Sequence, residues 1–131
     1  MLVILQRGYD ELSHEAARIV ASAVRKKPSL IAGLATGHTL VGTYGELVRM
    51  HKQEGLDFSR VVTFNLDEYV GLSPNHPQSF HDFMRRNFFD HVNVDPANIH
   101  IPNVSLNDNH EEYCSCYEAS VRRAGESTCS F

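Results

Sequence analysis

The sequence has no tryptophan, only 3 cysteines and no long apolar segment in its 131 residues. No run approaches the roughly 20 apolar residues that a membrane-spanning helix needs. The first residues also lack the basic start and long apolar core of a signal peptide. We therefore expect a cytoplasmic protein with no membrane partner. An excess of positive charge is missing too: the formal net charge is −4. Because nucleic acids select basic surfaces, we expect no nucleic-acid partner.

The cysteines and histidines do not form a metal-binding pattern. Cys114 and Cys116 are separated by one residue, whereas a zinc hairpin usually has roughly two to four, and no second pair completes four ligands. The 8 histidines are scattered, and no His-x-x-x-His pair occurs. We therefore expect no metal site.

What the sequence does contain is an alternation of short apolar runs and amphipathic segments. Hydrophobic residues make up 42% and charged residues 21%, as is typical of a single globular domain. Apolar runs predict strands at residues 2–5, 30–32 and 61–65, and a brief extended piece at 99–101. Helices are predicted from a cap at Asp10 to Pro28, from a cap at Thr39 to Gly55, and over 79–89 and 110–124. This alternation predicts a three-layer α/β domain with a mostly parallel sheet.

The segment 61–72 is the most informative part of the chain. Asp67 and Glu68 follow directly where the predicted buried strand ends, and the carboxyl ends of parallel strands border the ligand crevice in such sheets. Two neighbouring carboxylates repel, and shielding from water raises the proton affinity of one of them, which suits a general base near neutral pH. An exposed acidic turn is the alternative interpretation.

A turn of small residues at 33–39 connects a predicted strand to a predicted helix. Gly33 and Gly37 would let the backbone approach a ligand closely, and the N–H groups at the helix start attract an anion. Thr36 and Thr39 add hydroxyl donors. Since both loops would open on the same edge of the sheet, we interpret the pair as a base beside a phosphate cradle, suited to proton transfer on a phosphorylated small molecule. A simple helix cap is the alternative.

Several segments together resemble a known family, the glucosamine-6-phosphate deaminases. They are Leu34-Ala35-Thr36-Gly37-x-Thr39, Gly42-Thr43-Tyr44, Phe64-Asn65-Leu66-Asp67-Glu68-Tyr69-Val70-Gly71-Leu72 and His76-Pro77-x-Ser79-Phe80. The similarity extends to about Gly125. The resemblance implies a Rossmann-like α/β fold, no cofactor, and conversion of glucosamine 6-phosphate and water to fructose 6-phosphate and ammonia. The Asp67-Glu68-Tyr69 segment favours this activity over that of the related 6-phosphogluconolactonases.

The resemblance also implies roles for individual residues. Asp67 would be the base that moves the C2 proton of the sugar to C1 after ring opening, and we assign Glu68 a supporting role. The residues aligned with the loop that holds the sugar phosphate are Thr36, Gly37, His38 and Thr39.

The sequence departs from that family in three respects. His38 stands where the family usually has Gly or Ser, and Leu40 where it has Pro. Family members are about twice this length, and nothing after Gly125 matches their Asp-Gly-His-Ile-x-Phe-Asn-Glu-Pro motif, which supplies the ring-opening His. We therefore expect residues 1–125 to be the N-terminal part of such a domain, apparently truncated, and 126–131 to be a divergent tail. The chain alone is expected to have little or no deaminase activity.

Two alternatives to an enzyme remain open at this stage. One is a non-catalytic phosphosugar-binding or partner-binding paralogue, which forms a homo-oligomer or pairs with a full-length relative. The other is an unstable gene product with no function.

Overall fold

The computed structural model describes Val3, Leu5, Leu106, residues 7–104 and 108–125, and the backbone of 129–130. Its α-helices are α1 (Tyr9–Lys26), α2 (His38–Glu54), α3 (Phe80–Asn87) and α4 (His110–Ala124). Its strands are β1 (Ile31–Leu34), β2 (Val62–Asn65), β3 (Ile99–His100) and β4 (Cys129–Ser130), and two short 3-10 helices, η1 (Phe89–His91) and η2 (Pro96–Asn98), precede β3. No helix in these ranges is long and apolar enough to cross a membrane.

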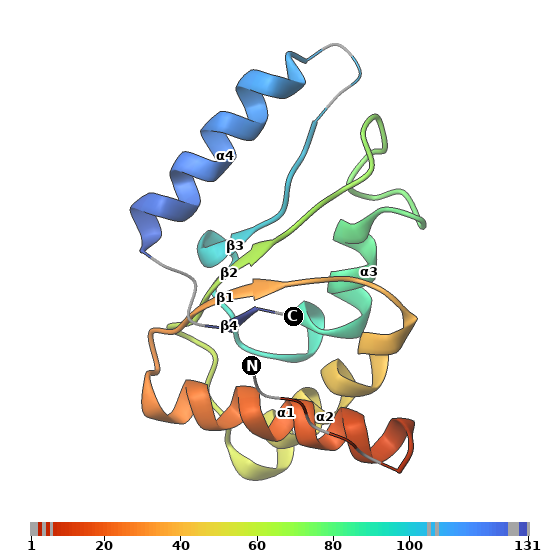
Figure 1. Ribbon diagram of the computed structural model, residues 1–131, viewed down its shortest axis with the longest axis vertical. Coiled ribbons are helices and arrows are strands. Elements are labelled where there is room, and N and C mark those ends of the chain that lie inside the picture. Colours follow the sequence, from red (N-terminus) through yellow and green to blue (C-terminus); the bar gives the residue numbers. More distant parts are fainter. Residues whose placement is uncertain are drawn as a thin grey trace.

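The four described strands form one sheet in the order β3-β2-β1-β4, and each pairs with its neighbours in parallel. Helices α1, α2 and α3 lie on one side of this sheet and α4 lies on the other (Figure 1). The predicted three-layer α/β architecture with a mostly parallel sheet is therefore confirmed. The crossover connections of such a sheet bring the carboxyl ends of its strands to one edge.

The core lies between the sheet and the first three helices. Leu30, just before β1, and Ala32 and Leu34 within it alternate along the chain. They meet the buried face of α1 and α2, where Val20 and Leu47 are almost fully enclosed. Aromatic rings complete this layer: Tyr44 of α2 and Phe88, directly after α3, lie with their ring centres 5.3 Å apart. This face therefore holds most of the apolar burial that stabilises the fold.

Two predicted helix caps are each wrong by two residues. Helix α1 begins after Gly8, which leaves Asp10 inside the first turn, where its charge complements the helix dipole. Helix α2 begins after Gly37, and Thr39 is its second residue. Glycine takes the cap position of α2 because the backbone there has a φ of 129°. The predicted end of α2 at Gly55 is confirmed, with the left-handed geometry typical of a helix terminus.

The predicted strand at 2–5 is not found: Val3 and Leu5 are not in a strand, and Leu2 and Ile4 lie outside the described residues. Strand β4 was not expected, and its backbone pairs with β1. Residues 126–128 and 131 lie outside the described residues, and the division at Gly125 into a domain and a divergent tail stays a prediction.

Candidate functional site

The carboxyl ends of β1 and β2 bring the two predicted loops together. Leu34 lies opposite Asn65 in the parallel register, and the Leu66 N–H donates to the Leu34 carbonyl at 3.1 Å. The turn at 35–39 and Asp67 therefore leave the sheet side by side, at the same edge. The predicted neighbourhood is confirmed, whereas the chemical roles of these residues stay predictions.

The start of α2 has the features of an anion site. Its cap residue, Gly37, offers no side-chain acceptor, so the N–H groups of the first turn are not satisfied by a capping side chain. Of the four described α-helices, α2 is the one without an acidic residue in its first turn. The partial positive charge at this helix end is therefore not neutralised locally. The His38 side chain, which departs from the family pattern, is exposed beside it.

Two tyrosines that the sequence analysis did not assign to the site fix this turn. The Tyr44 hydroxyl donates to the Ala35 carbonyl at 2.5 Å. The Tyr9 hydroxyl donates to the His38 carbonyl at 3.0 Å and accepts from the Gly42 N–H at 2.9 Å. Burial raises the pKa of Tyr44 well above its ordinary value, although the Ala35 carbonyl acts in the opposite direction, so this hydroxyl keeps its proton. Helical periodicity places Tyr44 in the core, but it does not predict where a hydroxyl group finds its acceptor.

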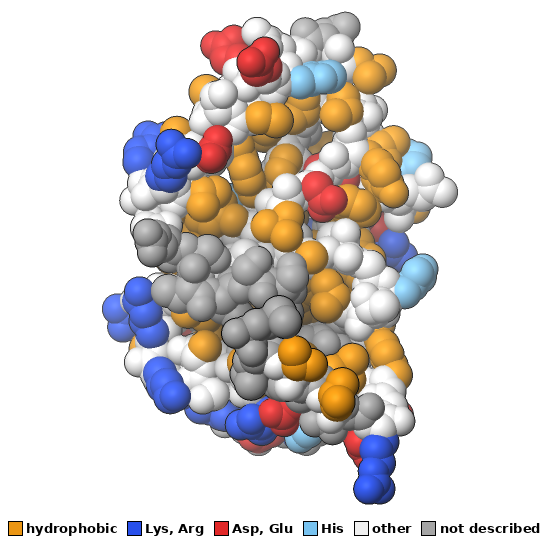
Figure 2. All heavy atoms as spheres, in the orientation of Figure 1, with side chains coloured by type: hydrophobic (Ala, Val, Ile, Leu, Met, Phe, Trp, Pro, Cys, Tyr) orange, Lys and Arg blue, Asp and Glu red, His pale blue; other side chains and the backbone are white. Residues whose placement is uncertain are grey.

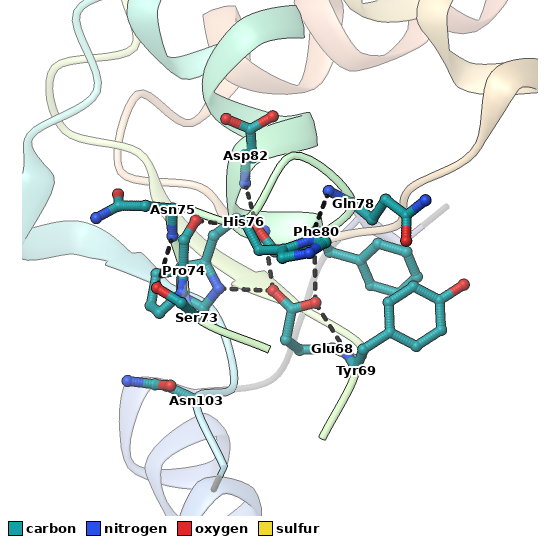
Figure 3. Close-up of polar contacts among 12 residues, drawn as sticks. Glu68, Tyr69, Ser73, Pro74, Asn75, His76, Gln78, Phe80, Asp82 and Asn103 are labelled. Atoms are coloured by element: carbon teal, nitrogen blue, oxygen red, sulfur yellow. Dashed lines mark hydrogen bonds and ion pairs between the residues drawn. The ribbon is translucent and has the colours of Figure 1, made fainter. Parts of the chain in front are cut away.

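Glu68 turns away from solvent and binds the start of α3 (Figure 3). One carboxylate oxygen accepts from the N–H groups of Tyr69 and Phe80 at 2.9 and 2.8 Å. The other accepts from the His81 N–H at 2.9 Å and lies 2.6 Å from His81 Nδ1. The Glu68 side chain is only 4% exposed. His81 is the partner that sequence reasoning missed, since it lies 13 positions after Glu68 in the chain.

The protonation of Glu68 differs from the expectation for a shielded carboxylate. Burial raises the pKa of Glu68, but the N–H groups of Phe80 and His81, the His81 ring and the Tyr69 N–H together outweigh burial. The net result is a pKa below the ordinary value, so Glu68 is a stable anion. The expectation that the shielded carboxylate of the pair has a raised proton affinity is therefore wrong. Asp67 is the exposed member of the pair.

A cavity of about 520 Å³ opens between the end of β2 and α4. Asp67 and Glu68 contribute to its border, but residues 36–39 do not line it. The rest of its wall is mainly apolar: Phe64, Leu66, Val70, Pro102, Val104, Tyr113, Tyr117 and Val121. Figure 2 shows hydrophobic side chains open to view in this hollow beside α4. A wall of this kind is uncovered core and does not suit the polar groups of a sugar phosphate.

Strand β2 also carries polar atoms without partners. The Thr63 hydroxyl and both amide atoms of Asn65 are buried and have no hydrogen-bond partner among the described residues. The Asn65 backbone is better satisfied, because its carbonyl accepts from the Tyr117 hydroxyl at 2.7 Å. A search of the same residues finds no group of three or more His, Cys, Asp or Glu side chains that could hold a metal ion.

Known proteins share this fold. The chain matches the family described as glucosamine-6-phosphate isomerases/6-phosphogluconolactonase over residues 6–131 and belongs to it. The resemblance drawn from the sequence motifs is thus confirmed.

Individual relatives agree with this assignment. The glucosamine-6-phosphate deaminase of Thermoanaerobacter sp. (strain X514) is 50% identical over 125 residues, which are 95% of this chain and 49% of the relative. The deaminase of Halothermothrix orenii is also 50% identical, over 95% of this chain and 52% of its own. The chain thus spans about half the length of the curated relatives it matches.

Solved structures give the same picture. A monomeric glucosamine-6-phosphate deaminase superposes with a TM-score of 0.92 at 43% identity, over 97% of this chain and 52% of that one. The 6-phosphogluconolactonase of Thermotoga maritima superposes with a TM-score of 0.75 over 98% of this chain and 56% of that one. At 22% identity, the second structure shows a common fold alone.

Proposed function

We propose that this chain carries two components of a glucosamine-6-phosphate deaminase site: the turn that binds the phosphate of the sugar and the carboxylate that moves its proton. The observation that carries the proposal is the pairing of Leu34 with Asn65, which starts both loops at one edge of the sheet. The naming of the relatives as glucosamine-6-phosphate deaminases supports the choice of substrate.

The phosphate would bind at the start of α2. The N–H groups of His38 and Thr39 belong to the first turn of this helix, where the dipole favours a dianion. The hydroxyl groups of Thr36 and Thr39 are further donors. The positive φ of Gly37 gives this turn its shape, and the Tyr9 and Tyr44 hydroxyls hold it before any ligand arrives. Such preorganisation reduces the ordering that binding would otherwise require.

Asp67 would act on the other end of the open-chain sugar. Its carboxylate takes the proton from C2 and gives it back at C1. A second proton passes from the amine nitrogen to the C1 oxygen, so that the C1 aldehyde becomes an alcohol and the C2 amine becomes an imine. Water then hydrolyses the imine, which leaves the C2 ketone of fructose 6-phosphate and releases ammonia. A single acid–base step contributes about 10²–10⁴ in rate, and ring opening needs a further acid–base group. We therefore expect the 131-residue chain alone to release ammonia very slowly or not at all.

Calorimetric titration with fructose 6-phosphate tests the phosphate site without any need for turnover. We expect wild-type chain to bind and Gly37→Ala to bind at least tenfold more weakly, because alanine resists the positive φ of this position. Gly45→Ala is the matched control in the same helix: a Cβ there meets nothing within 4 Å. Failure of the wild type to bind, or equal affinity for Gly37→Ala, would contradict the proposal.

A second candidate function is a non-catalytic protein that pairs with a full-length relative. The apolar cavity beside α4 favours it, since no residue of α4 is buried and the side chains that line the cavity are available to another polypeptide. Light scattering on the chain alone and mixed with a full-length deaminase distinguishes the two functions. A stable mixed complex without phosphosugar binding would support pairing, whereas a chain that stays monomeric in both samples would exclude it.

A further inference from the structure

The loop between β2 and α3 is closed by a single buried side chain. Glu68 leaves the strand end, and Phe80 and His81, 12 and 13 residues further on, return to its carboxylate. We call this group of contacts the Glu68 clamp: the carboxylate, the N–H groups of Phe80 and His81, and the His81 ring. Everything between its two ends is a loop without helix or strand.

The clamp also completes the start of α3. The first two N–H groups of this helix, from Phe80 and His81, donate to Glu68, and the third, from Asp82, donates to the Ser79 hydroxyl at 3.0 Å. The first N–H groups of a helix have no partner within the helix itself. Because Glu68 is charged and shielded, its bonds are stronger than those between neutral groups.

The same contacts exclude Glu68 as a second base. A carboxylate has roughly four lone-pair sites. The N–H groups of Tyr69, Phe80 and His81 and the His81 ring supply four contacts to them. Glu68 could take a proton from a ligand only by releasing the helix.

Asp67 lies between two anchored residues. On one side, the Leu66 N–H is bonded to the Leu34 carbonyl of the sheet. On the other, Glu68 is bonded to α3. We propose that Glu68 is a positioning residue: the Glu68 clamp fixes the backbone of Asp67 and thereby the direction in which its carboxylate points. The importance of that direction rests on the proposed function, but the clamp itself needs no ligand.

NMR relaxation on the labelled 131-residue chain tests the clamp. We expect a backbone order parameter of about 0.85 at Asp67 in the wild type and below about 0.6 in Glu68→Gln, while Thr63 in β2 stays at about 0.85 in both. Ser79→Ala is the matched control, because it weakens the start of α3 without touching Glu68. Asp67 should remain rigid in that variant, whereas a merely structural role would affect Asp67 in both.

Three results would overturn the proposal: a mobile Asp67 in the wild type, an unchanged Asp67 in Glu68→Gln, or an equal loss in Ser79→Ala. If Glu68→Gln does not fold, His81→Ala replaces it. That variant removes one of the four contacts, so we expect an intermediate order parameter, and a wild-type value would count against the clamp.

Titration of the wild type with fructose 6-phosphate, read at the amides of residues 37–39, separately tests the proposed function. A rigid Asp67 that depends on Glu68, in a chain that does not bind the phosphosugar, would preserve the clamp and reject the function.

Discussion

The two faces of the sheet are built from similar residues but are covered very differently. On the face of α1 and α2, valines and leucines such as Val20 and Leu47 are 4% and 1% exposed. On the other face, α4 contributes no buried residue. Its Tyr117 ring lies 6.0 Å from the ring centre of Phe64, but a cavity of about 520 Å³ stays open between the end of β2 and α4. An amphipathic sequence therefore predicts a helix but not the burial of that helix, because burial depends on the residues that pack against it.

The two parts of the candidate site rest on differently packed regions of the sheet. The phosphate turn rests on the well-packed face, where the buried Tyr44 holds Ala35. Asp67 stands at the border of the open cavity and depends on the Glu68 clamp for its position. We therefore expect phosphate binding to be robust in this chain and the proton-transfer group to be the more sensitive part.

The largest predicted effect comes from the same substitution made on both faces. Val20→Ala should lower the free energy of unfolding by about 2–3 kcal/mol, since two buried methyl groups are lost and a cavity remains. Val121→Ala should change it by less than about 1 kcal/mol, because this side chain is only partly buried beside an open cavity. The gain in helix propensity is common to both and cancels in the comparison. Urea denaturation measures both values, and equal losses would show that the α4 face is packed as well as the other.

A smaller effect, of about 1–3 kcal/mol, is expected for Glu68→Gln at neutral pH, because buried N–H groups lose a charged acceptor. The effect should depend on pH. Since folding lowers the pKa of Glu68, its contribution is complete above the unfolded value of about 4.3 and is lost as the pH falls through the lower folded value. Urea titrations of both proteins at pH 7 and pH 3 should therefore show a gap in stability that narrows in acid. A gap that stays constant would mean that charge at Glu68 does not stabilise the fold.

Local patterns were sufficient for much of the fold. The helical period and Gly125 correctly predict α4, and the apolar run before Asp67 predicts β2 to within one residue. These signals are local because side-chain spacing follows the geometry of the element itself. The predicted caps at Asp10 and Thr39 are wrong because each helix begins two residues earlier, after Gly8 and Gly37, and a side chain suited to capping does not by itself fix where a helix begins.

The sequence predicts which loops lie together at the candidate site, but not the hydrogen bonds within it. Parallel strand order places residues 36–39 beside Asp67 from topology alone. Which carboxylate is shielded could not be read in this way, because it depends on Phe80 and His81 folding back across a long loop. The sequence shows only that two acidic residues are adjacent. The tertiary structure is needed to distinguish the exposed residue from the anchored one.

The smallest expected effect tests whether the buried polar groups on the α1 and α2 face of the sheet all have hydrogen-bond partners. The Thr63 hydroxyl is buried there without a partner among the described residues, so it pays for desolvation and gains no bond in return. Thr63→Val keeps the shape and removes the unpaired group, and we expect it to stabilise the chain by about 1 kcal/mol. Ser79→Ala is the contrasting control: the Ser79 hydroxyl accepts from Asp82 and donates to the Pro74 carbonyl, so its loss should destabilise by about 1 kcal/mol. Thermal melts of the two variants should therefore move in opposite directions, and a loss of stability in Thr63→Val would show that this hydroxyl has a partner after all.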